Sequence, residues 1–64
     1  MKHPYIEKAE LIRCIHHETK KLWTEEGKYA LSEMQEIYLA ALRAEEWNLR
    51  RLALLDKQYT ATYN

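Results

Sequence analysis

The sequence predicts an all-α fold, an antiparallel two-helix hairpin that dimerises into a four-helix bundle. One glycine, one proline and no valine occur in the chain, and helix-forming Ala, Leu, Glu, Lys and Arg dominate. Apolar residues recur at helical spacing in two long runs, one on each side of Gly27. A chain of 64 residues with a single cysteine has a small core and no intrachain disulfide, which favours stabilisation by a second copy.

The first helix is expected from about residue 4 to about residue 25. Pro4 suits the first turn, because its missing N–H would have no partner there. His16 is expected to be a core-edge histidine, and Gly27 can take the left-handed conformation that closes a helix. A connection over about residues 26–32 follows. The inward-facing stripe of the first helix is expected to contain Tyr5, Ala9, Ile12, Ile15, Thr19, Leu22 and Trp23.

The second helix is expected from about residue 33 to about residue 58, with a frayed tail over residues 59–64. Ser32 and Gln35 match a capping box, in which each side chain binds the backbone N–H of the other residue. Glu46 and Arg50 have the spacing and order of a favourable i, i+4 ion pair. Two helices of similar length and a short connection predict one hairpin domain over residues 1–64.

A heptad-like seam with one amide in it runs along the second helix. Asn48 in such a seam fixes the register of associating helices, because two amides bond only when they face each other. A second strip, about 100° round the helix, contains Tyr38, Leu42, Leu49 and Ala53. So wide an apolar arc predicts burial on more than one side, and the sequence leaves open which strip faces the first helix. The predicted dimer interface comprises Met34, Ile37, Ala41, Ala44, Asn48, Leu52 and Leu55.

Three potential zinc ligands lie on one side of the first helix: Glu10, Cys14 and His17. A single straight helix cannot close a tetrahedral site with them unless a second chain contributes, so we interpret them as a polar face and expect no metal or cofactor. A dimer bridged by a metal at these residues is the third hypothesis. Cys14 and His17 could pair a thiolate with a base, but a regular helix offers no preorganised oxyanion hole. The sequence therefore predicts a protein that is not an enzyme.

The charge balance and the apolar pattern restrict the partners. Ten basic and ten acidic side chains cancel, so no net field draws the chain to nucleic acid or to a membrane. No apolar run approaches the length of a membrane span, and the first eight residues hold no signal-peptide core. A lone cysteine suits a reducing compartment. We expect a cytoplasmic protein without nucleic-acid or membrane partners.

Exposed aromatic and basic side chains are the expected contacts to a partner protein, because tryptophan and arginine are enriched in binding hot spots. The two tryptophans could instead pack at hairpin or dimer edges, and the arginines could form a solvated helix face. The predicted partner-binding residues are Trp23, Tyr29, Trp47, Arg50, Arg51, Tyr59 and Tyr63. The first functional hypothesis is a non-catalytic interaction module that covers a partner's surface as an adaptor, antagonist or inhibitor, as small phage and mobile-element proteins do.

One segment around the start of the second helix resembles a known family. Lys28-Tyr29-Ala30-Leu31-Ser32-Glu33 followed by Tyr38-Leu39-Ala40-Ala41 is similar to the Lys-Tyr-x-Leu-Ser and Tyr-x-Ala-Ala elements of the Hha/YmoA nucleoid-associated modulators. The similarity covers under a quarter of the chain, the two tyrosines are closer together than in that family, and Leu42-Arg43-Ala44 replaces its Asp-His-Arg. The resemblance implies a second hypothesis, a transcription or nucleoid modulator that acts on DNA or through a DNA-binding protein.

Overall fold

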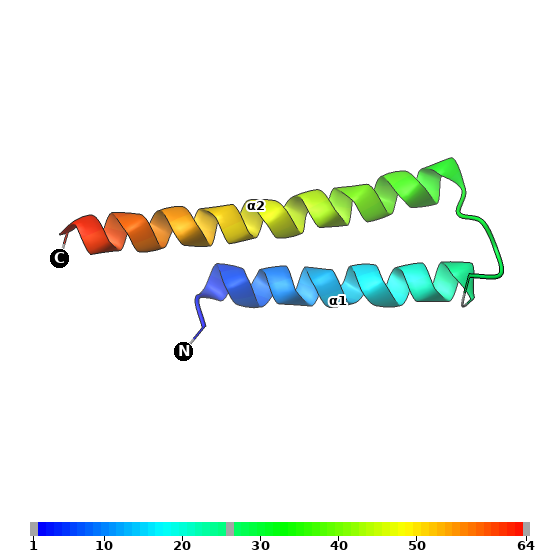
Figure 1. Ribbon diagram of the computed structural model, residues 1–64, viewed down its shortest axis with the longest axis horizontal. Helices are drawn as coiled ribbons and strands as arrows, with labels where there is room; N and C mark the ends of the chain where they lie inside the picture. The colour runs from blue at the N-terminus through cyan, green and yellow to red at the C-terminus, as the bar shows by residue number, and fades with distance from the viewer. Residues whose placement is uncertain (1, 26, 64) are drawn as a thin grey trace.

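The computed structural model confirms an all-α hairpin of two packed antiparallel helices. It describes the backbone of residues 2–25 and 27–63 and the side chains of residues 2–25 and 27–56. Helix α1 spans Pro4–Thr24 and helix α2 spans Glu33–Tyr63, and the two lie side by side with the connection at one end (Figure 1). Neither helix, over its described residues, is both long and apolar enough to cross a membrane.

The hairpin is a rod. Its radius of gyration is 15.3 Å, whereas a compact chain of this length would have about 11 Å. Its extents of 52 × 22 × 11 Å correspond to one layer of two helices lying next to each other. A single layer can bury only one face of each helix, so the other faces remain in contact with water.

The N-terminus of α1 is held by the residue that precedes it. Pro4 occupies the first helical position, as predicted, and His3 is the N-cap. The His3 Nδ1 accepts a hydrogen bond from the Tyr5 N–H at 3.1 Å, and its Nε2 lies 2.6 Å from Oδ2 of Asp56 on α2. His3 therefore caps one helix and contacts the other.

The residue that closes α1 is Glu25 and not Gly27. Glu25 has φ 41° and ψ 63°, a left-handed conformation that is uncommon for a residue with a Cβ. Gly27 also has a positive φ, of 86°, but it lies two residues further on, within the connection. The Tyr29 N–H donates to the Thr24 C=O at 3.2 Å and satisfies one of the last carbonyls of the helix.

Helix α2 begins where the sequence predicts and ends later than expected. The capping box is confirmed: the Gln35 N–H donates to Ser32 Oγ at 3.2 Å, and the Ser32 N–H donates to Gln35 Oε1 at 2.9 Å. The end expected near residue 58 is wrong, since α2 continues to Tyr63 through most of the segment expected to fray. No glycine or proline follows Gly27, so no residue stops the helix once it has formed.

The helices meet through a small apolar core. Leu39, Leu49 and Ala53 of α2 are buried against α1, whose Ala9 is fully buried, and Leu42 is half-buried beside them. The second strip of the predicted arc, which contains Leu49 and Ala53, therefore faces α1. Leu39 belongs to this face as well, although neither predicted strip includes it.

The inward stripe of α1 is narrower than predicted. His16 is half-buried between Ile12 and Thr19, which agrees with a histidine at the edge of the core. Ile15 and Leu22 were expected on this stripe, but they are 40% and 72% exposed. The stripe advances by alternating steps of three and four residues, from Ile12 to His16 and on to Thr19. His16 therefore lies on the stripe, and the adjacent Ile15 lies outside it.

Candidate interaction surface

The outward face of α2 is apolar and uncovered. Nine residues, or two and a half turns, separate Ala44 from the buried Ala53, so these two lie on opposite sides of the helix. The predicted seam thus faces away from α1, and Met34 and Ile37 are 75% and 56% exposed. All of its residues are exposed in the hairpin: Met34, Ile37, Ala41, Ala44, Asn48, Leu52 and Leu55.

A second apolar strip lies on α1 and was not predicted from the sequence as an exposed surface. Leu11, Ile15 and Leu22 are spaced i, i+4, i+11, so they share one side of the helix, and all three are exposed. Their spacing was the available signal, but two of them were assigned to the inward stripe. Both helices therefore present apolar side chains to water.

The total exposed area is large for a chain of this size. A compact protein of 7.8 kDa is expected to expose roughly 4,400 Å². The hairpin exposes 5573 Å², which is about 1,200 Å² more. A standard protein–protein interface buries about 800 Å² on each partner, so the surplus is sufficient for one such interface.

One flank of α2 carries basic side chains around a tryptophan. Arg43, Trp47, Arg50 and Leu54 are spaced i, i+4, i+7 and i+11 and form a single strip. Trp47 is 65% exposed and Leu54 is 57% exposed. The predicted ion pair is confirmed, since Arg50 Nε donates to Glu46 Oε2 at 3.0 Å.

Two basic residues of α1, Arg13 and Lys20, lie on the same side of the hairpin as this strip. The hydrogen bond from Lys2, at 2.8 Å, is the main reason that the pKa of Glu10 is lowered, and the positive charges of Arg50 and Arg13 lower it further. Arg13 follows the buried Ala9 of α1 by four residues, just as Arg43 follows the buried Leu39 of α2. In an antiparallel pair these equal offsets turn both arginines to the same side of the contact between the helices. Lys20 lies two turns along α1 from Arg13, on the same side. The resulting surface, which we name the basic flank, consists of Arg13, Lys20, Arg43, Trp47, Arg50 and Leu54.

The other predicted partner-binding residues have different surroundings. Trp23 is half-buried, and its ring packs at a tilt against Tyr38 with centroids 5.5 Å apart, so it lies at the edge of the hairpin. Tyr29 in the connection is 59% exposed. Arg51 is exposed next to the outward face of α2. Two further residues lie in α2 outside the described side chains: Tyr59 and Tyr63.

The three candidate zinc ligands on α1 are not assembled into a site. Among the described residues, no group of three His, Cys, Asp or Glu side chains could hold a metal ion. Both carboxylate oxygens of Glu10 accept a hydrogen bond from Lys2 Nζ, while Cys14 and His17 are exposed. The spacing that brought these residues to one side of the helix leaves them separated along it.

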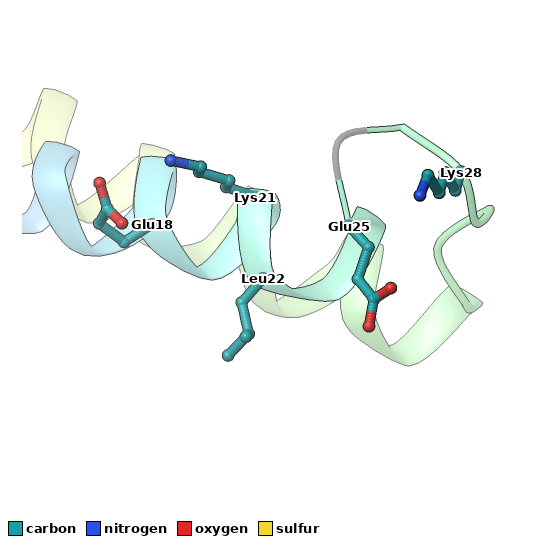
Figure 2. A pocket seen from close by; sticks show the side chains of 5 residues that line it. All are labelled: Glu18, Lys21, Leu22, Glu25 and Lys28. Atoms are coloured by element: carbon teal, nitrogen blue, oxygen red, sulfur yellow. The ribbon is translucent and has the colours of Figure 1, made fainter.

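A hollow near the connection is lined by charged side chains (Figure 2). Its residues come from the last turns of α1 and from the connection: Glu18, Lys21, Leu22, Glu25 and Lys28. Every one of them is exposed, so water reaches the hollow freely. It lacks the enclosed, mostly apolar lining that small-molecule sites have.

In comparisons with known proteins, no family model, curated protein or solved structure matches the chain. The likeness to the Hha/YmoA modulators therefore rests on the two short sequence elements alone. A functional proposal therefore rests on three surfaces: the outward face of α2, the exposed strip of α1 and the basic flank.

Proposed function

We propose that this protein is a non-catalytic protein-interaction module. Two hairpins associate into a four-helix bundle, and the dimer acts as an adaptor, antagonist or inhibitor by covering a surface of a partner protein. The observation that carries the proposal is the surplus of about 1,200 Å² of exposed surface over that of a compact chain. Uncovered apolar surface on two sides of so small a protein is typical of association sites.

A second copy fits the outward face of α2. The face has its large side chains toward its two ends, with Met34 and Ile37 at one and Leu52 and Leu55 at the other. Small alanines lie between them, where two helix backbones can approach closely. The same patch on both subunits then forms a two-fold interface.

The dimensions of the hairpin support the same arrangement. The rod is 22 Å wide and 11 Å thick, and packed helices lie about 8–10 Å apart. Met34 and Leu52 lie about a quarter turn from the buried Ala53, so a second hairpin stacked on that flat side of the rod gives a nearly square cross-section, the form of a four-helix bundle. The exposed strip of Leu11, Ile15 and Leu22 supplies α1 with apolar surface for the second layer.

Contact with another protein is left to the surfaces outside this interface. Among the described side chains, Trp47 on the basic flank and Tyr29 in the connection are the most exposed aromatic residues, at 65% and 59%. The free thiol of Cys14 is exposed, which supports a place in the reducing cytoplasm. Neither the hollow of Figure 2 nor the polar face of α1 offers a reaction centre, which supports a non-catalytic role.

Two measurements test this proposal. Sedimentation equilibrium at micromolar concentration should give twice the chain mass of 7.8 kDa. Affinity purification of the tagged protein from its native host, followed by reconstitution with the purified candidate, should yield a stoichiometric protein complex. A cooperatively folded monomer at low micromolar contradicts the dimer. If the purification recovers DNA and no protein partner, and the binding of that DNA weakens steeply with added salt, the nucleoid-modulator hypothesis is supported instead.

A further inference from the structure

The basic flank contains three cations that form no ion pair with the described side chains. Within the described side chains, no carboxylate lies within ion-pair distance of Arg13, Lys20 or Arg43. Arg50 is the member of the flank with an acidic partner, Glu46. Three cations on one surface of a chain with zero formal net charge make a local positive region that can attract an acidic ligand.

Large apolar side chains lie among these cations. Trp47 and Leu54 are both more than half exposed, seven residues apart on the strip of α2 that bears Arg43 and Arg50. A tryptophan surrounded by arginines is the composition of a protein-binding hot spot. Arginine also pairs with carboxylates in a bidentate geometry, which adds direction to the charge attraction.

We infer that the basic flank binds an acidic, amphipathic helical segment of a partner protein. The apolar side of that helix would cover Trp47 and Leu54, and its carboxylates would meet Arg13, Lys20 and Arg43. The inference rests on the proposed function, since it names the chemistry of the partner that the module covers. From Arg43 to Leu54 the strip is about 16 Å long, which matches three turns of a bound helix.

The composition of the flank favours an acidic protein segment over nucleic acid. The apolar side chain of Leu54 has no group that could bind a phosphate, and a nucleic-acid duplex on the flank would leave that side chain hydrated. Glu10 and Glu46 border the flank, so an evenly spaced row of phosphates would meet these carboxylates as well as the cations. A protein helix can place apolar side chains over the centre of the flank and carboxylates only where the cations lie.

A binding experiment with purified full-length protein tests the inference. Trp23→Phe leaves Trp47 as the single tryptophan and reports on the flank by fluorescence. The probe is a synthetic Leu/Glu peptide of about five helical turns, with leucines at i, i+3, i+4 and i+7. We expect a saturable blue shift of the Trp47 emission. No shift, or an equal shift with a peptide of the same composition but scattered leucines, overturns the inference.

Lys20→Glu and Lys21→Glu form a matched pair of variants. Both residues are exposed neighbours in the same turn of α1 and change the net charge equally, but only Lys20 belongs to the basic flank. We expect Lys20→Glu to weaken peptide binding about fivefold and Lys21→Glu less than about twofold, the scale of exposed ion pairs. Equal weakening by both variants, or tighter binding of a DNA duplex than of the peptide, overturns the inference.

The two proposals fail in distinguishable ways. A dimer that keeps its purified protein partner with unchanged affinity after Lys20→Glu would disprove the role of the flank and leave the proposed function intact. A monomer that nevertheless binds the acidic peptide through Trp47 would support the flank and contradict the proposed dimer.

Discussion

Replacement of Ile37 by alanine should weaken the dimer about a hundredfold. The substitution removes three carbons, worth about 2.4 kcal/mol if they were fully buried. Ile37 is 56% exposed in the hairpin, so about 1.3 kcal/mol of this burial free energy is gained only when the dimer covers the exposed part of the side chain. The interface contains the residue twice, once in each subunit, which gives about 2.7 kcal/mol or a hundredfold in Kd.

Leu54→Ala is the matched control for this prediction. Leu54 lies on the same helix, loses the same number of carbons and is 57% exposed, but it belongs to the basic flank and not to the outward face. Sedimentation equilibrium over a wide concentration range gives the Kd of both variants. If the two variants weaken the dimer equally, or if neither does, the outward face of α2 is not the interface and the reasoning is refuted.

Three further predictions concern polar residues. Ser32→Ala should cost about 1 kcal/mol in a denaturant melt by removing the cap of α2, without changing the dimer Kd; no loss would mean that the cap does not stabilise the helix. Asn48→Leu should raise the melting temperature and give mixed oligomers in native mass spectra, whereas an unchanged melt with one dimer species would place Asn48 outside the interface. Because the folded-state pKa of Glu10 is lowered, its contribution to stability is present at neutral pH and is lost as the pH falls through that lowered pKa. Lys2→Ala should raise this pKa toward its ordinary value in an NMR titration, and an unchanged pKa would exclude Lys2 as the main cause.

The parts of the fold set by local interactions were predictable from the sequence. Ser32 and Gln35 are three positions apart, and the hydrogen bonds between them depend on little beyond their own helix start. The Glu46–Arg50 pair is equally local. These features, with a composition poor in glycine, were enough to predict two helices and the short connection between them.

The choice of faces depended on the packing of one helix against the other. Leu39 and Leu49 face α1 and Ile37 faces outward, although each of the three belongs to a series of apolar residues at helical spacing along α2. Ile15 was misplaced for the same reason, because the half-buried His16 takes its position on the inward stripe. The basic flank was not predictable either, since it combines residues of α1 with residues of α2 on one side of the hairpin.

The contacts of His3 join the two helices in one register at the open end of the hairpin. Its Nδ1 accepts the Tyr5 N–H, so the ring hydrogen belongs on Nε2, where it faces the carboxylate of Asp56. A shift of α1 by one turn, about 5.4 Å, would break this contact at the open end of the hairpin. The two residues are 53 positions apart, so this contact closes nearly the whole chain into a ring. Loss of a single imidazole would therefore remove the cap of α1 and one of its contacts with α2 together.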